Sequence, residues 1–426
     1  MTTSTDDPAD GKDLTQKADA WRARLGIGQA ARAPILEATA NSRDSGEGPG
    51  DRAAGAMALE AATDEHGPPE ERIERARAQM RELVNTQFGG DQALLDGVEA
   101  LAIDAREATA LLQADITPAA PPNWISLEAV VAFDGTRPSF LVQNGEVQLE
   151  GAYAVERWRT ELAPFLTHLN DMAACVGRVE RGEIHIGTAF LIGPELVLTN
   201  RHVVQSISFA GEEGRQIYPG TNLDFGREYQ GRATHDRRKV LEIVAMGVQT
   251  IEGLIVDHRR LDLALLRVSP STLTGAAKQR FLKLSKVKDA LEPGLSVVTA
   301  GYPVAWQDAV PEQLQIAHGA VLARLLAGDG GSKRLSPGLS QGMLATPGGE
   351  PSWTGLHDAT TLRGNSGSPM AVLGTGALKV RGLHYGGAAL EDRVNWCHLL
   401  QHCLVAPCLP SSKPLGEILQ AEGVEL

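Results

Sequence analysis

A serine lies between two glycines in the stretch Gly364-Asn365-Ser366-Gly367-Ser368-Pro369, which constrains the fold of this chain more than any other segment. Flanking glycines allow a sharp turn, so the serine hydroxyl can be exposed while backbone N–H groups converge on one point. We expect the N–H groups of Gly364 and Ser366 to form an oxyanion hole there. A serine hydroxyl is a weak nucleophile until a neutral imidazole takes its proton. The stretch therefore needs a histidine and an orienting acid elsewhere in the chain.

Both candidates precede the serine. His202 lies in Thr199-Asn200-Arg201-His202-Val203-Val204, and Asp262 stands at the head of an apolar run. The order His202, Asp262, Ser366 predicts acyl transfer, in which the serine attacks, the histidine moves the proton and the aspartate fixes the tautomer of the ring. Asp257 is the competing acid, but Asp262 is favoured because apolar residues follow it directly.

Over about residues 171–410, these ordered motifs resemble the trypsin/chymotrypsin-like serine peptidase superfamily. Residues 187–192, followed by 197–200, resemble the strand pair that leads into the family's histidine. Asn365 and Ser368 make the bacterial glutamyl-endopeptidase-like branch the most similar one. The resemblance implies an all-β fold, a chymotrypsin-like double six-stranded antiparallel β-barrel preceded by a helical N-terminal region. It also implies a serine endopeptidase that hydrolyses polypeptides without a cofactor.

The same branch suggests which residues contact the substrate. A histidine at the position of His384, and a threonine at that of Thr361, contact an acidic substrate side chain in these enzymes. An imidazole and a hydroxyl can both donate hydrogen bonds to a carboxylate. The resemblance therefore implies cleavage after Glu or Asp, with the substrate backbone added as a strand beside Tyr385 and Gly386. The alternative for His384 is a core histidine satisfied by backbone groups.

We predict five segments: an acidic disordered segment 1–70, a helical hairpin 71–116, a lead-in 117–170 packed on the protease, a protease domain 171–412 and a C-terminal tail 413–426. Within the lead-in, residues 125–133 and 139–142 are predicted strands.

In the second helix of the hairpin, apolar residues recur at spacings of four and three after a candidate N-cap, Asp91. They are Leu94, Val98, Leu101, Ala105, Ala108 and Leu112. This seam either packs on the chain's own protease domain or docks a regulator.

Composition narrows the class of protein. The 426 residues carry a net charge of −13, and residues 1–116, with 22 acidic and 12 basic side chains, hold −10 of it. A basic stripe with interleaved aromatics is missing, so we expect no nucleic-acid partner. The sequence contains no long apolar run, so we expect no membrane span. An acidic, polar start and only four cysteines favour a cytoplasmic location.

Near the C-terminus, Cys397, His398, His402 and Cys403 permit a zinc interpretation, because His398 and His402 are four residues apart. The cysteines lack the spacing of paired zinc knuckles. We therefore expect no metal, and a terminal helix whose cysteines are apolar core residues.

Two functional hypotheses remain. The first is a cytoplasmic serine endopeptidase that is regulated through its N-terminal region. The second is a catalytically silent adaptor with a protease fold that acts through its N-terminal helices. The presence of all three triad residues favours the enzyme.

Overall fold

The computed structural model describes Ala18 and residues 68–118, 121–149, 156–211, 214–231, 236–251, 257–274, 280–303, 317–327, 331–344, 352–361, 364–374, 378–388 and 394–426. The chain divides into two compact units. The helical unit comprises residues 1–136, 314–325 and 388–393, and the barrel unit comprises residues 137–313, 326–387 and 394–426. The predicted disordered segment 1–70 lies almost wholly outside the described residues.

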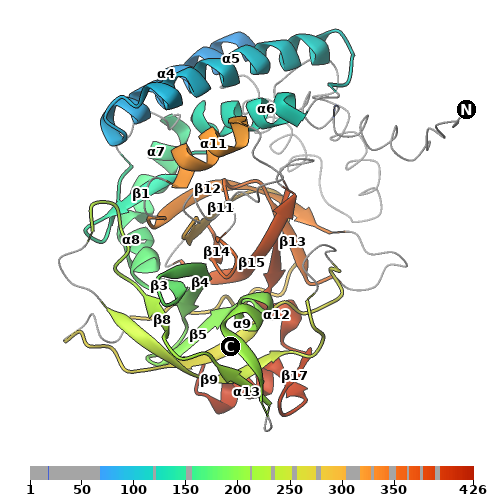
Figure 1. Cartoon of the computed structure of the whole chain (residues 1–426). Coiled ribbons are helices and arrows are strands. Elements are labelled where there is room, and N and C mark those ends of the chain that lie inside the picture. Colours follow the sequence, from blue (N-terminus) through green and yellow to red (C-terminus); the bar gives the residue numbers. More distant parts are fainter. Residues whose placement is uncertain are drawn as a thin grey trace, which may run out of the picture. The chain divides into compact units, whose positions relative to one another are not determined.

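Three helices from the N-terminal part build the helical unit: α4 (Pro69–Gln87), α5 (Gln92–Gln113) and α6 (Pro121–Phe133) (Figure 1). Gly89 and Gly90, with φ of +60° and +75°, form the turn between α4 and α5. Asp91 caps α5 as predicted, since its carboxylate accepts hydrogen bonds from the N–H groups of Ala93 and Leu94. A buried ion pair of 2.7 Å between Arg72 and Asp134 ties α4 to the end of α6.

The predicted apolar seam of α5 is buried within this unit. Its neighbours include α11 (Ala317–Ala327), which belongs to the helical unit over residues 317–325 although its sequence lies inside the second barrel (orange in Figure 1). Arg324 of α11 pairs with Asp91 at 2.9 Å. A Cβ added at Gly97 would lie 2.5 Å from a methyl of Val321, so α5 and α11 pack closely at this glycine.

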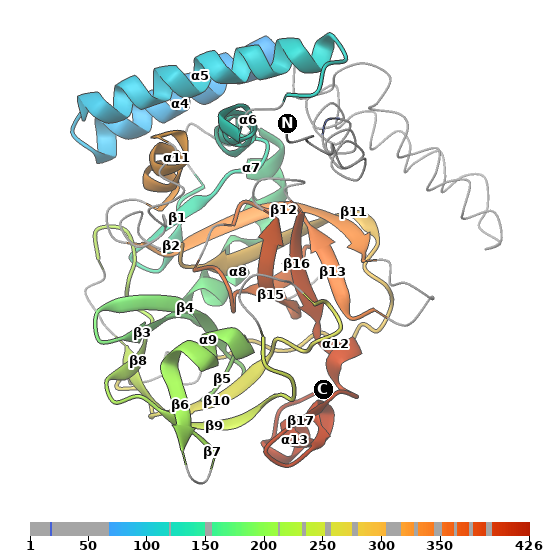
Figure 2. The same ribbon diagram turned by 45° about the vertical axis from the view of Figure 1, so that its right-hand side comes forward.

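Two closed six-stranded antiparallel β-barrels form the barrel unit (Figure 2). The first consists of β3 (Val176–Arg181), β4 (Ile184–Leu191), β5 (Leu196–Thr199), β8 (Thr221–Asp224), β9 (Arg237–Gly247) and β10 (Ala264–Val268), and is closed by the β9–β10 pairing. The second consists of β11 (Pro293–Gly301), β12 (Arg334–Met343), β13 (Thr354–His357), β14 (Pro369–Val372), β15 (Val380–Ala388) and β16 (Val394–Leu399), and is closed by the β11–β12 pairing. Valine- and leucine-rich strands suit these pleated, largely buried positions.

Shorter elements surround the barrels. They are β1 (Phe140–Gln143), β2 (Glu146–Val147), α7 (Glu156–Leu162), η2 (Ala163–Phe165), α8 (Leu166–Ala174), α9 (Arg201–Ile207), β6 (Ser208–Gly211), β7 (Gly214–Ile217), α12 (Leu400–Cys403), β17 (Pro407–Leu409), β18 (Lys413–Pro414) and α13 (Leu415–Ala421). Strand β1 extends the second barrel by pairing with β12, and β17 extends the first by pairing with β9. One hydrophobic core runs through both barrels and includes Leu415 and Leu419 of α13.

Three segments differ from the sequence predictions. Residues 125–133, predicted as a strand, form helix α6, and this part of the lead-in belongs to the helical unit. The predicted tail after residue 413 contains β18 and α13, with Leu415 and Leu419 fully buried. The predicted terminal helix around Cys397 is instead strand β16 followed by one helical turn. The first case is a short apolar run, which carries no clear period. In the second, Leu415, Ile418 and Leu419 do recur at helical spacing, and their burial makes this segment part of the barrel core. In the part of the chain that the structure describes, no helix is long and apolar enough to cross a membrane.

Candidate active site

Strand pairing brings His202 and Asp262 together. Thr199 at the end of β5 lies opposite Ala264 at the start of β10, so residues just beyond these ends become neighbours. The Nδ1 of His202 lies 2.6 Å from Oδ2 of Asp262. The backbone N–H of His202 donates to the other carboxylate oxygen at 2.9 Å. Two bonds from one residue therefore fix both the ring and the start of α9 against the carboxylate.

Asp262 is buried and held from further sides. The side-chain amide of Asn200 donates to the carbonyl of Asp262 at 2.8 Å, and the N–H of Asp262 donates to Nε2 of His398 at 2.9 Å. Burial by itself would raise the pKa of Asp262, but the charge and hydrogen bonds of His202 outweigh it and lower this pKa below its usual value. The carboxylate is therefore ionised at neutral pH. Asp257, the competing acid, instead pairs with Arg259 at 2.9 Å.

His398 is a contributor that the sequence did not identify. The sequence suggested it only as a zinc ligand, but its ring is fully buried and stacked on Tyr385. Burial lowers the pKa of His398 to about 4, so the ring is neutral and its Nε2 can accept the Asp262 N–H. No local pattern reveals this role, because His398 is 136 residues from its partner. Among the described residues, which include all four cysteines, no group of three or more side chains could hold a metal ion.

The nucleophile loop, residues 364–368, turns at Gly364 and Gly367, whose φ angles are +94° and +95°. Its carbonyl groups are hydrogen-bonded: the Thr188 hydroxyl donates to Gly364 O, Ser368 N–H to Asn365 O, and Thr188 N–H to Ser366 O. No hydrogen bond between described residues uses the N–H of Gly364 or Ser366. These two N–H groups are the ones predicted for the oxyanion hole.

Ser366 lies on the second barrel and His202 on the first, and Gly187 of β4 contacts both Ser366 and the neighbour of His202, Val203. A Cβ at Gly187 would lie 2.7 Å from a Val203 methyl and 3.2 Å from Ser366 O. Among the described residues, no hydrogen bond joins the Ser366 hydroxyl to the His202 ring. In enzymes without substrate this bond is often long and tightens only when substrate binds.

The predicted substrate-contacting residues fall into two groups. Two backbone hydrogen bonds hold His384 against the nucleophile loop: its N–H donates to Ser368 O, and its carbonyl accepts from Gly367 N–H. Its buried ring lies 5.5 Å from the ring of His357, and within the described part of the chain its Nδ1 has no hydrogen-bond partner. Thr361 is occupied, because its hydroxyl donates to Oδ1 of Asn395 at 2.5 Å.

Tyr385 and Gly386 are the predicted strand partners of a substrate, and the side chain of Tyr385 is buried in the protein. The Tyr385 hydroxyl points into the core, where it bonds to His258 at 2.6 Å and to Thr354 at 3.1 Å. A Cβ at Gly386 would lie 3.3 Å from the Trp396 ring. The ladder between β14 and β15 runs only from Val380 to Leu383, so the backbone at Tyr385 and Gly386 continues past the end of β14.

Comparisons with known proteins indicate a serine-protease-like domain. Residues 187–378 match the trypsin-like peptidase domain, and this match supports the trypsin/chymotrypsin-like superfamily. A relative from Lysobacter enzymogenes, named "Probable serine protease", is 27% identical over 289 residues, which cover 62% of this chain and 70% of the relative.

Solved structures with low overall similarity include two proteases. Neuropsin from mouse brain shares 13% identity, with a TM-score of 0.37, over 54% of this chain and 91% of neuropsin. A protease from M. tuberculosis in its inactive form shares 20% identity, with a TM-score of 0.32, over 55% of this chain and 84% of that protein.

Proposed function

We propose that this protein is a serine endopeptidase in which His202, Asp262 and Ser366 form the catalytic triad. The observation that carries the proposal is the Asp262 carboxylate, which binds both the ring and the backbone N–H of His202. His202 takes the proton from Ser366 as the Ser366 oxygen bonds to the substrate carbonyl carbon. The N–H groups of Gly364 and Ser366 stabilise the resulting oxyanion. His202 then gives its proton to the leaving amine, and water hydrolyses the acyl-enzyme by the same route.

Covalent labelling tests this mechanism. An alkyl fluorophosphonate should label the wild-type protein at Ser366 and should not label Ser366→Ala. A Ser206→Ala variant serves as a control, because Ser206 is exposed and its hydroxyl donates to the His202 carbonyl within α9. Labelling that survives in Ser366→Ala would overturn the assignment. An unlabelled wild-type protein would favour the catalytically silent adaptor.

Cleavage after Glu or Asp is the specificity that His384 supports. Burial, and then the neighbouring rings of His357 and His202, lower the pKa of His384 well below its usual value. A neutral ring can still donate one N–H to a carboxylate, and its unpaired Nδ1 leaves hydrogen-bonding capacity for it. Thr361 would contribute only after releasing Asn395.

A mixed peptide library should give cuts after Glu or Asp with the wild type. His384→Ala should lose these cuts while retaining cleavage at other sites. His258→Ala is the matched control, since the His258 ring bonds to the Tyr385 hydroxyl at 2.6 Å. An unchanged cleavage profile in His384→Ala would exclude the acidic pocket.

Regulation through the helical unit and a reducing, cytoplasmic location complete the proposal. All four cysteines are buried and free, as expected for a protein made in a reducing compartment. Helix α11 packs on α5 in the helical unit, and in sequence it lies between strands β11 and β12 of the second barrel. A change in α5 can therefore reach the second barrel through α11 and the chain on either side of it.

Gly97→Leu should displace Val321 and change kcat by several-fold, whereas Ala110→Leu on the exposed face of α5 should not. Equal kcat values in the two variants would argue against regulation by this route. Recovery of a cellular partner that binds wild type but not Gly97→Leu would identify the regulator.

A further inference from the structure

Thr188 of β4 makes four hydrogen bonds at the junction of the barrels. Its N–H donates to Ser366 O at 2.8 Å, and its hydroxyl donates to Gly364 O at 2.8 Å. The same hydroxyl accepts from the N–H of Tyr302 at 3.1 Å. Its carbonyl accepts from the Thr199 hydroxyl at 2.7 Å. Thr188 is fully buried, so water cannot replace these partners.

Two of these bonds determine how the backbone around Ser366 is oriented. The Ser366 N–H belongs to the peptide group that carries the Asn365 carbonyl, and this carbonyl accepts from Ser368 N–H at 2.9 Å. Thr188 holds the peptide groups on either side through Gly364 O and Ser366 O. Because each peptide group is planar, a fixed carbonyl also fixes the opposite N–H. Three consecutive peptide groups are therefore held, two of them by Thr188.

Two glycines allow the nucleophile loop to pack directly on β4 and the end of β11. A Cβ at Gly367 would lie 1.8 Å from the Thr188 carbonyl oxygen. A Cβ at Gly301, the residue before Tyr302, would lie 2.0 Å from the Ser368 hydroxyl. The loop therefore contacts β4 and the end of β11 with no room for an intervening side chain.

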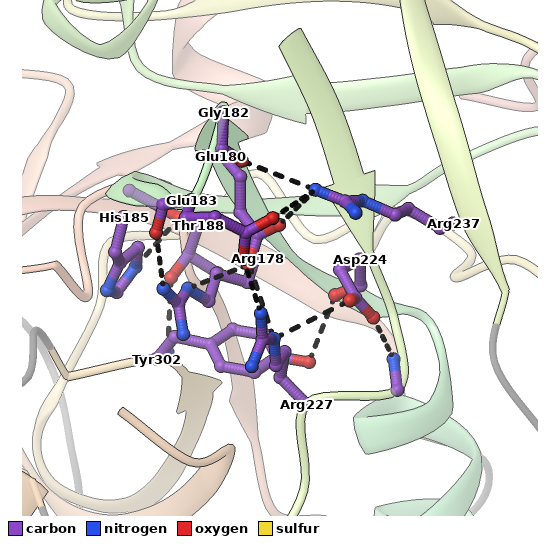
Figure 3. Close-up of polar contacts among 12 residues, drawn as sticks. Arg178, Glu180, Gly182, Glu183, His185, Thr188, Asp224, Arg227, Arg237 and Tyr302 are labelled. Carbon is purple, nitrogen blue, oxygen red and sulfur yellow. Dashed lines mark hydrogen bonds and ion pairs between the residues drawn. The ribbon is translucent and has the colours of Figure 1, made fainter. Parts of the chain in front are cut away.

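Tyr302, whose N–H donates to the Thr188 hydroxyl, is itself held in place by further contacts. The Tyr302 hydroxyl donates to the Asp224 carbonyl at 3.3 Å, and the Lys333 ammonium lies 5.6 Å from the ring centre. Figure 3 shows Tyr302 beside Thr188 and a buried ionic cluster. In that cluster, Glu180 is fully buried and pairs with Arg178 at 3.2 Å and with Arg237 at 3.0 Å. The pair with Arg237 joins β3 to β9, and the Tyr302 hydroxyl contacts β8 through Asp224.

We propose that Thr188 is a positioning residue that orients the nucleophile loop for catalysis through its side-chain hydroxyl. This inference rests on the proposed function, because it assigns Ser366 and the N–H groups of Gly364 and Ser366 to the reaction. The hydroxyl, donating to Gly364 O and accepting from Tyr302 N–H, fixes the Gly364–Asn365 peptide group, which lies between the two N–H groups of the oxyanion hole and sets their relative orientation before substrate arrives. Substrate binding outside the oxyanion hole does not involve Thr188.

Thr188→Val removes the hydroxyl at nearly constant volume, and Thr188→Ser retains it. Thr299→Val is the matched control, because Thr299 is also a buried strand threonine but its hydroxyl has no hydrogen-bond partner among the residues that the structure describes. Using a peptide that the wild type cleaves, kcat and KM are measured well below the unfolding temperature of each variant. The rate of labelling by an alkyl fluorophosphonate is measured in parallel.

Thr188→Val should lower kcat and the labelling rate about 10- to 100-fold, somewhat less than the loss of a direct oxyanion donor, with KM changed less than about threefold. Thr188→Ser should restore most of the rate, and Thr299→Val should match the wild type. If Thr188→Val does not fold, Thr188→Ala replaces it with the same expectations.

A wild-type rate in folded Thr188→Val, or an equal loss in Thr188→Ser, would overturn the positioning role and leave the proposed function intact. A loss expressed only in KM would also overturn it. A wild-type protein that neither cleaves nor becomes labelled would refute the proposed function itself, and the positioning role with it.

Discussion

Gly367→Ala should destabilise the protein because the nucleophile loop rests directly on β4. Gly367 has a φ of +95°, a conformation that costs a residue with a Cβ about 1–2 kcal/mol. The new Cβ would lie 1.8 Å from the Thr188 carbonyl oxygen and 2.7 Å from the Thr199 hydroxyl. The backbone would have to move by roughly 1.5 Å to bring this Cβ to a normal contact distance. That shift breaks the Thr188–Ser366 and Thr199–Thr188 hydrogen bonds, each worth about 1 kcal/mol and more if a buried group stays unpaired.

These contributions predict a loss of about 3–5 kcal/mol in the free energy of unfolding. Urea unfolding measures it, with Gly182→Ala as the control. Gly182 also has a positive φ, +65°, but a Cβ there meets nothing within 4 Å. The control should therefore lose only about 1 kcal/mol. Equal losses in the two variants would refute the close contact between the loop and β4.

Three further predictions follow from the same structure. Asp262→Asn should lower kcat about 10³- to 10⁴-fold by removing the acceptor that fixes the His202 ring, whereas Asp257→Asn should leave kcat within about twofold; comparable kcat values in steady-state assays would contradict the assignment. Leu419→Ala should cost about 2–5 kcal/mol of unfolding free energy in urea, because Leu419 is buried in the barrel core, while exposed Glu417→Ala should cost under about 0.5 kcal/mol. Burial lowers the pKa of His357 to about 4. Below about pH 6.5, His357 is therefore protonated in the unfolded chain but stays neutral in the folded protein. The free energy of unfolding should consequently fall by about 2 kcal/mol per such histidine between pH 7 and pH 5.

The pH prediction has its own control. His357→Gln removes the titrating group and should reduce the difference in unfolding free energy between pH 7 and pH 5 by about 2 kcal/mol. His398, whose pKa burial also lowers to about 4, should contribute in the same direction. A variant with the wild-type pH dependence would show that His357 does not titrate differently in the two states.

Local patterns in the sequence were sufficient for several elements. The helices 69–87 and 92–113 follow from apolar spacing, the Asp91 cap and the Gly89-Gly90 break. The double barrel followed from three short motifs in order, through resemblance and not from strand periodicity. Helix α6 was mistaken for a strand because residues 125–133 form a short, mostly apolar run without a clear helical period. The side chains of this helix that the structure describes are all buried.

The sequence by itself determined which chemical groups are present and in which order, since a glycine-flanked serine, an imidazole and a carboxylate are identifiable one by one. Only the tertiary structure decided what holds them. His398 supports Asp262 across 136 residues, and the Thr188 hydroxyl supports Gly364 across 176. Such partners leave no local signature, because a buried hydrogen bond depends on where two strands lie and not on the residues that flank either one.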